Sequence, residues 1–346
     1  MLDDRNVLNQ RDPHDALGIA AAQYAQTNFE ARVWSPEHDG RQINKIVVAG
    51  MGGSALAALL VKVWLKDVLS IPFEIVRTYN LPEYVGSDTL VIASSYSGNT
   101  EETLSALDQA KSRGAQTAII ASGGALIDIA TVDSIAHVQL PNGMQPRMAV
   151  IFNLKALVSI LANFAIVDNR YLNEITDLSD WLQQETSAWA GDVTTDKNYA
   201  KQLALLAVGK TAIFYGGSIT APVAYKWKIS WNENAKNVAF YNELPEFNHN
   251  EFIGWTSHPV EKPFAVFDLI SSKEHSQVLK RFEVSDRLLS GKRPKATRIE
   301  LAGDTVLAQL LWGSILADFV SIYVAILNGV DPTPVALIEK LKAELA

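Results

Sequence analysis

The chain contains no cysteine among its 346 residues, so disulfide bonds and thiolate metal sites are excluded. Its six histidines are scattered and never form an HExxH pair, and we therefore expect no metal ion. Basic clusters are also missing, because 38 Asp and Glu residues outnumber 30 Lys and Arg residues and the net charge is −8. Nucleic-acid-binding proteins carry a basic patch or arm, and we accordingly expect no nucleic acid partner.

An uninterrupted apolar run of about 18 residues, as a membrane-spanning helix requires, does not occur. Residues 1–5 also lack the apolar core of a signal peptide. These two absences predict a cytoplasmic protein with no membrane partner. Hydrophobic residues still make up 48% of the chain, and its length is about twice that of a typical domain. We therefore expect two α/β domains, at residues 1–152 and 153–346.

Strand-like and helix-like stretches alternate in the first domain. The expected strands occupy residues 45–49, 73–76, 89–93, 116–121 and 134–140, and the expected helices occupy residues 55–68, 101–113 and 125–131. Strands that are joined by crossover helices form a parallel sheet with both faces covered. The pattern therefore predicts an α/β fold built on a doubly wound parallel sheet.

A hydroxyl-rich turn, Ser-Tyr-Ser-Gly-Asn-Thr at residues 95–100, lies between the third strand and its helix. Ser95, Ser97 and Thr100 can turn three hydroxyls toward one point, and Gly98 lets the backbone come close to a ligand. The free N–H groups at the start of the helix favour an anion, so the turn suits a phosphate group. The alternative is a turn whose hydroxyls only cap the helix.

A second glycine-rich turn, Gly-Met-Gly-Gly-Ser at residues 50–54, follows the first strand. Two such turns on one sheet can face one ligand. With the next residue the turn also satisfies the dinucleotide pattern G-x-G-x-x-A. An NAD site needs an acidic residue at the end of the next strand, where Arg77 stands instead, but Arg77 leaves an NADP site open.

The second half of the chain repeats the pattern weakly. An expected helix at 199–208 and strand at 211–215 lead into Gly-Gly-Ser at 216–218 and a helix at 221–236; a strand at 264–269, a helix at 274–289 and a strand at 296–301 follow. We infer an internal duplication in which the second copy has lost the hydroxyl-rich turn. Further helices are expected at residues 15–33, 149–167, 171–190, 305–328 and 334–345.

Polar and aromatic residues are interleaved at residues 231–251 of the second domain. The stretch contains Asn-Glu-Asn-Ala-Lys at 232–236 and Pro-Glu-Phe-Asn-His-Asn-Glu at 245–251. This mixture suits a half-buried site. A helix end followed by an ordinary charged loop is the alternative.

These motifs together resemble the sugar isomerase (SIS) proteins, and within them the bifunctional phosphoglucose/phosphomannose isomerase family. The resemblance extends from the turn at 50–54 through the turn at 95–100, Pro-Arg at 146–147 and the motifs at 232–236 and 245–251 to Asp-Pro-Thr-Pro at 331–334. The two turns alone mark only the SIS superfamily. Their combination with the later motifs is more selective.

The resemblance implies a role for each matching residue. Glu233 corresponds to the base that moves a proton between C2 and C1, Arg147 to the arginine beside the enediolate, and His249 to the ring-opening histidine. In such homodimers that histidine comes from the neighbouring subunit. For the lysine of the last helix we prefer Lys340 to Lys342, because Lys340 follows Thr333 by two helical turns. The phosphate-binding positions are Gly53, Ser54, Ser95, Ser97 and Thr100.

The implied activity is an aldose–ketose isomerisation of glucose 6-phosphate, and by the same resemblance of mannose 6-phosphate, with fructose 6-phosphate. It implies a place in glycolysis and gluconeogenesis. One carboxylate can take a proton next to a carbonyl and return it to the adjacent carbon, without a metal or redox cofactor. A neutral histidine suits ring opening near pH 7. The alternative is a regulatory SIS protein that only binds a phosphosugar, although such a sensor has no use for Glu233 or His249.

Overall fold

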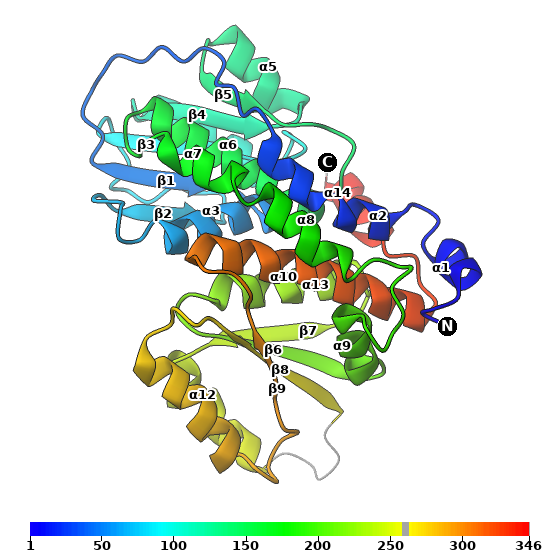
Figure 1. The fold of residues 1–346 in the computed structure, drawn as a ribbon. Coiled ribbons are helices and arrows are strands. Elements are labelled where there is room, and N and C mark those ends of the chain that lie inside the picture. The colour runs from blue at the N-terminus through cyan, green and yellow to red at the C-terminus, as the bar shows by residue number, and fades with distance from the viewer. Residues whose placement is uncertain (258–262, 346) are drawn as a thin grey trace. The chain divides into compact units, whose positions relative to one another are not determined.

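The computed structural model describes residues 1–257 and 263–345, and the chain divides into two compact units (Figure 1). Residues Gln23–Trp181 form one, which we call the five-stranded unit; Met1–Ala22 and Leu182–Ala346 form the other, the four-stranded unit. The boundary that we predicted between residues 152 and 153 falls inside helix α6 (Val150–Asn163). Helix α6 belongs to the five-stranded unit because it packs against α3 (Gly52–Trp64), which follows the first strand.

The five-stranded unit contains one fully parallel sheet, as predicted. Its strands have the order β2-β1-β3-β4-β5. In chain order they are β1 (Lys45–Ala49), β2 (Phe73–Val76), β3 (Thr89–Ser94), β4 (Gln116–Ala121) and β5 (Ala136–Gln139). The order reverses between β1 and β3, and in such sheets ligands bind outside the carboxyl ends of the strands at this switch point.

Helices cover both faces of this sheet, and nearly all residues of its central strands are therefore buried. Val47, Val91 and Ile119 face helices α4 (Glu101–Ser112) and α5 (Gly124–Val132). Helices α3 and α6 lie together against the opposite face.

The four-stranded unit contains a second parallel sheet, with the order β7-β6-β8-β9. Its strands are β6 (Thr211–Gly216), β7 (Ala239–Glu243), β8 (Phe264–Ile270) and β9 (Thr297–Glu300). This order matches β2-β1-β3-β4 of the other sheet, which agrees with the inferred duplication. Strand β7 was not predicted, because at the edge of the sheet only the first of its five residues is buried and its sequence carries no apolar alternation.

Helix α12 (Ser276–Leu288) covers one face of this second sheet, while α9 (Tyr199–Ala207), α10 (Ala221–Glu233) and α13 (Val306–Asn328) gather on the other (Figure 1). In the described chain, α13 is the one helix long and apolar enough to span a membrane, but 94% of its apolar window is buried. The core helix of a soluble protein has the same character. We accordingly describe α13 as the central helix of the unit.

Several helices differ from the predicted ones. The single helix expected at 15–33 is instead α2 (Ala16–Ala21) and a 3₁₀ helix, η1 (Gln23–Asn28), and an additional helix, α1 (Arg5–Arg11), precedes them. The helix expected at 171–190 is divided into α7 (Arg170–Thr176) and α8 (Ser179–Ser187). In both cases the apolar periodicity continues through a break in the backbone, so the break leaves no mark on the pattern.

Candidate active site

The hydroxyl-rich turn lies at the carboxyl end of β3, next to the switch point of the five-stranded sheet. Ser95 Oγ is 2.7 Å from Thr100 Oγ1 and 3.4 Å from Ser97 Oγ, so the structure brings the three hydroxyls together. Thr100 is the N-cap residue of α4, but its side chain makes no capping hydrogen bond. The hydroxyl of Thr100 therefore belongs to the cluster, and the first N–H groups of α4 have no side-chain acceptor at the cap.

Gly98 occupies the tightest position of this turn. Its φ of 73° lies in the left-handed region, and a Cβ atom there would be 1.8 Å from the carbonyl oxygen of Gly123. The side chain of Asn99 secures the same contact by accepting a hydrogen bond from Ala125 N at 2.9 Å. The turn is thus packed against the loop after β4, and only glycine fits at residue 98.

The glycine-rich turn lies at the carboxyl end of the neighbouring strand β1 and leads into α3. Ser54 Oγ accepts a hydrogen bond from Tyr96 N at 3.2 Å, which joins the two turns. A Cβ atom at Gly50 would be 2.6 Å from Ser94 O, so the turn lies directly against the end of β3. Helix α3 also lacks a side-chain cap at Met51. Two uncapped helix starts therefore lie beside one hydroxyl cluster, an arrangement that favours an anion such as phosphate.

Arg147 lies in the same unit, in the 3₁₀ turn η2 (Pro146–Met148). It is 98% buried, and its Nη1 donates to Gln145 Oε1 at 3.2 Å. The turn touches the glycine-rich loop: a Cβ atom at Gly53 would be 2.7 Å from Pro146 O. A buried guanidinium is costly unless it is paired. Arg147 is therefore a fixed positive charge on the turn that packs against Gly53.

Tyr96, which the sequence did not mark as a site residue, secures the segment before Arg147. Its hydroxyl donates to Pro141 O at 2.8 Å and accepts from Met144 N at 3.1 Å. Burial raises the pKa of Tyr96, so the hydroxyl keeps its proton. The sequence did contain a signal for Tyr96. It stands between two predicted site hydroxyls, Ser95 and Ser97, so its side chain has to point away from them and pack elsewhere.

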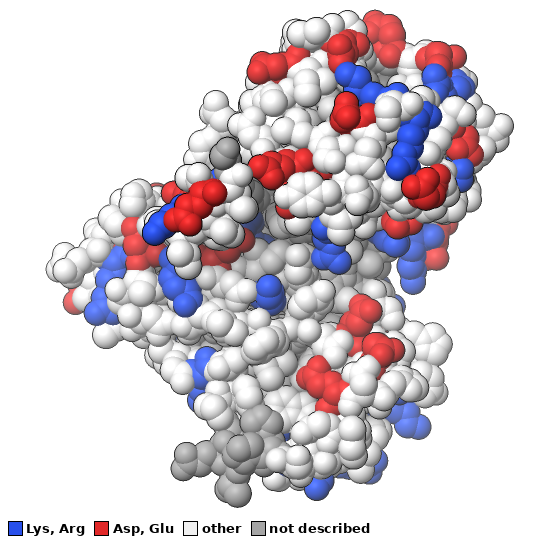
Figure 2. Space-filling model, turned by 180° about the vertical axis from the view of Figure 1, so that it is seen from behind, with Lys and Arg blue, Asp and Glu red and all other residues white. Residues whose placement is uncertain are grey.

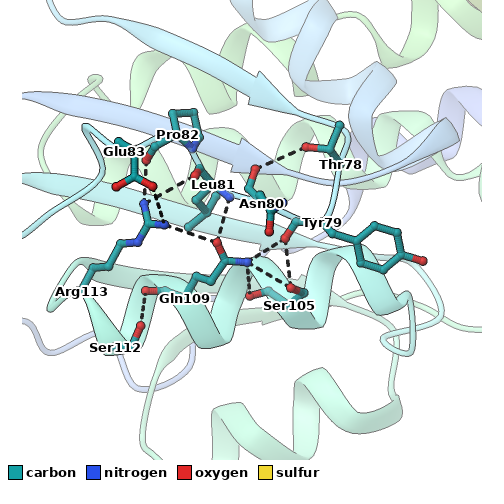
Figure 3. Close-up of polar contacts among 10 residues, drawn as sticks. All are labelled: Thr78, Tyr79, Asn80, Leu81, Pro82, Glu83, Ser105, Gln109, Ser112 and Arg113. Atoms are coloured by element: carbon teal, nitrogen blue, oxygen red, sulfur yellow. Dashed lines mark hydrogen bonds and ion pairs between the residues drawn. The ribbon is translucent and has the colours of Figure 1, made fainter.

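A polar network braces α4 from the side of the segment that follows β2 (Figure 3). Gln109 Nε2 donates to Tyr79 O at 2.7 Å, Gln109 Oε1 accepts from Leu81 N at 3.1 Å, and Ser105 Oγ donates to Tyr79 O at 3.0 Å. Arg113 Nη1 reaches Pro82 O at 2.7 Å. These bonds hold the helix whose N-terminus faces the hydroxyl cluster.

Glu233 is the last residue of α10 in the four-stranded unit, and it is half-buried. The other polar residues of its motif hold the helix end in place. Asn232 Oδ1 accepts from Ala239 N at 3.0 Å, and Asn234 Nδ2 donates to Ser321 Oγ at 2.9 Å. Lys236 folds back, and its Nζ donates to Glu233 O at 2.5 Å and Pro332 O at 3.0 Å. The motif is thus a rigid frame around one carboxylate.

His249 ends the 3₁₀ helix η3 (Glu246–His249) and is exposed. Among the residues that the structure describes, its ring has no hydrogen-bonding partner. Its neighbours are held: Asn248 Nδ2 donates to Ser285 Oγ at 2.8 Å, and Glu251 accepts from the Tyr215 hydroxyl and from Asn242 Nδ2, the latter at 2.7 Å. Burial, followed by the charge of Glu251, raises the pKa of Tyr215, which therefore remains a donor. His249 is presented to solvent on an ordered loop.

Lys340 does not fit the argument by which we chose it. Thr333 precedes the start of α14 (Ala336–Leu345), so the two residues do not share a helix and cannot share a helical face. Lys340 is exposed, and its Nζ lies 3.6 Å from Glu344 Oε1. Lys342 is exposed on the same helix. The two lysines are therefore not distinguished by the structure of this unit.

The second sheet has its own glycine turn, and its carboxylate partner, Glu274, was missed in the sequence. Glu274 Oε2 accepts a hydrogen bond from Ile219 N at 2.8 Å, just before the start of α10. A Cβ atom at Gly217 would be 2.3 Å from the same oxygen. Glu274 follows β8, as the hydroxyl-rich turn follows β3. The protein's own carboxylate thus fills the anion position in the second copy, which leaves the first copy as the candidate phosphate site.

Comparisons with known proteins match both halves of the chain. Residues 41–156 match the SIS domain family, and residues 196–345 match the bacterial phospho-glucose isomerase C-terminal SIS domain. The bifunctional phosphoglucose/phosphomannose isomerase of Caldicellulosiruptor bescii is 38% identical over 309 residues, which cover 88% of this chain and 90% of that protein. The Aquifex aeolicus protein of the same name is 33% identical, with coverage of 87% and 90%. A glucose-6-phosphate isomerase like protein from Thermus thermophilus shares the fold, with a TM-score of 0.65, 17% identity and 98% coverage of both chains.

Proposed function

Because this chain belongs to the bifunctional phosphoglucose/phosphomannose isomerase family, as its motifs predicted, we propose how its residues divide the work of isomerisation. The chain is an aldose–ketose isomerase that interconverts glucose 6-phosphate, and mannose 6-phosphate, with fructose 6-phosphate. The regulatory alternative is not favoured, since it gives no purpose to Glu233 and His249.

The substrate phosphate binds at the two joined turns. The hydroxyls of Ser95, Ser97 and Thr100 and the first N–H groups of α3 and α4 supply the donors, with Gly53 and Ser54 forming the second turn. The observation that carries this proposal is the Thr100 hydroxyl, which joins the cluster instead of capping its helix. A capping residue would hydrogen-bond the backbone of α4.

Glu233 transfers the proton between C2 and C1 of the open-chain sugar. A carboxylate suits both directions of this step. The hydrogen bonds of Asn234 and Lys236 hold the end of α10 in place and so keep the orientation of the Glu233 side chain constant. Arg147 supplies a positive charge to the developing enediolate, and its burial strengthens such an interaction. One of the lysines of α14, Lys340 or Lys342, completes the set.

His249 opens the sugar ring in the site of a second subunit. Its exposure on an ordered loop supports this assignment, since a histidine that served its own unit only structurally would be buried or paired. The edge strand β7 also exposes Phe240 (56%), next to Val238 (67%), and exposed apolar edges are usually covered. We place the homodimer in the cytoplasm, in glycolysis and gluconeogenesis.

A coupled assay tests the activity: glucose 6-phosphate and mannose 6-phosphate should each yield fructose 6-phosphate without added metal. On the described face shown in Figure 2, acidic and basic side chains are interspersed and do not form one extended basic patch. Mixing Glu233→Gln and His249→Ala subunits tests the dimer. If His249 acts across the interface, mixed dimers regain one intact site, whereas an active monomer of about 38 kDa in sedimentation contradicts the assignment.

A further inference from the structure

A fully buried ion pair joins the two central helices of the four-stranded unit. Lys226 Nζ on α10 lies 2.6 Å from Asp318 Oδ1 on α13, and both side chains have 0% exposure. Ser230 Oγ donates to the same carboxylate oxygen at 2.7 Å. The chain thus places two opposite charges, both fully buried, between α10 and α13. Such a pair needs an explanation other than stability, because desolvation commonly cancels the Coulombic gain of a buried pair.

The pair belongs to a polar stripe that runs along α10 toward Glu233. Lys226, Ser230 and Asn234 are spaced by four residues and therefore lie on one face of the helix. Each is bonded to α13: the first two to Asp318, and Asn234 to Ser321 Oγ at 2.9 Å. The stripe ends at Asn234, the residue directly after Glu233.

We propose that Lys226 and Asp318 are positioning residues, which set the rotation and register of α10 on α13 and so orient the Glu233 carboxylate. Contacts between apolar side chains allow a helix to slide or turn by small amounts. The Asp318 carboxylate, which accepts hydrogen bonds from both Lys226 and Ser230, has directional partners and permits one arrangement of the two helices. A displacement of about 1 Å at a reacting group can cost about 10² in rate. The inference rests on the proposed role of Glu233 as the base.

The double variant Lys226→Met/Asp318→Leu tests this inference, because it replaces both charges by apolar groups of similar volume. We expect kcat with fructose 6-phosphate to fall by about 10- to 100-fold, while KM changes by less than about twofold. The urea midpoint should equal or exceed that of the parent. In a Glu233→Gln background the same replacement should lower the residual rate by less than about twofold, since the two changes act on one group.

Lys201 and Asp3 provide a control pair within the same unit, in which the lysine is fully buried and the aspartate side chain is 45% exposed. The Lys201 side chain has 0% exposure and pairs with Asp3 at 3.0 Å, but Lys201 lies on α9 and also donates to Gly191 O and Val193 O. Lys201→Met/Asp3→Leu should therefore lower the urea midpoint and leave kcat at the parental value.

Three results overturn the inference. Parental kcat in Lys226→Met/Asp318→Leu, with an inactive Glu233→Gln variant, removes the positioning role and leaves the proposed base intact. An equal fall of kcat in the Glu233→Gln background shows that the pair acts through something else. An active Glu233→Gln variant overturns the base itself, and the positioning role with it. Should the double variant fail to fold, Ser230→Ala decides: it keeps both charges, and we expect kcat to fall at least about twofold with unchanged KM.

Discussion

Replacement of Glu233 by Gln is expected to abolish isomerisation nearly completely while the protein remains folded. Gln keeps the shape and hydrogen-bonding reach of Glu but cannot accept the C2 proton. General-base catalysis contributes about 10² to 10⁴ in rate, and kcat should fall by that factor. Glu233 is only half-buried, so the free energy of unfolding should change by less than about 1 kcal/mol.

Glu251 supplies the contrasting control in the same polar stretch. Its carboxylate accepts hydrogen bonds from the Tyr215 hydroxyl and Asn242 Nδ2. Hydrogen bonds to charged groups contribute about 1.5–3 kcal/mol each, and Gln retains one acceptor oxygen. Glu251→Gln should therefore lower the free energy of unfolding by about 2 kcal/mol, with kcat close to that of the parent.

The assay measures kcat with fructose 6-phosphate and, in parallel, the exchange of solvent deuterium into C2, for Glu→Gln variants at 233, 243, 246 and 251. Urea denaturation gives the stability of each variant. If Glu233→Gln still exchanges the C2 proton at the parental rate while one of the other three does not, the base is misassigned.

Three further predictions follow from individual contacts. Ser97→Ala and Thr100→Ala should mainly raise KM, since their hydroxyls bind a group remote from the reacting carbons; parental phosphosugar affinity in isothermal titration for both would remove the phosphate assignment. Gly98→Ala should lose phosphosugar binding more completely than either, because the new Cβ meets Gly123 O at 1.8 Å, and parental affinity would contradict the packing of that turn. Burial raises the pKa of Asp268 to about 7, so its protonation stabilises the fold below pH 3.8 and this stabilisation is lost as the pH rises through 7. Asp268→Asn should therefore raise the urea midpoint at pH 8 more than at pH 5, and an equal change at both values would refute the shift.

The sequence by itself determined the elements that local patterns encode. Apolar runs bounded by turn residues placed β1, β2 and β4 at their observed bounds and β3 within one residue, whereas β5 is two residues shorter at its start and one at its end than the strand predicted at 134–140. The hydroxyl-rich turn could be located because its strand, turn and helix start are contiguous in the chain. Its capacity to bind an anion can therefore be recognised without knowledge of distant residues. The motif around Glu233 was expected at the end of a helix at 221–236, and α10 starts at the expected residue but ends three residues earlier, at Glu233.

Only the tertiary structure decided the contacts between residues that lie far apart in the chain. Lys226 and Asp318 are separated by 92 residues, and nothing in the sequence pairs them. A lysine in α10 is equally compatible with a solvent-exposed position, and an aspartate in the apolar helix α13 does not indicate which cation it meets. The bond between Ser54 and Tyr96, the bond from Ile219 to the Glu274 carboxylate and the pairing of edge strand β7 with β6 are also contacts of this kind. Periodicity reports which face of an element is apolar, but the partner of a polar group is chosen by packing, where each buried donor or charge must be satisfied by whatever the fold brings beside it.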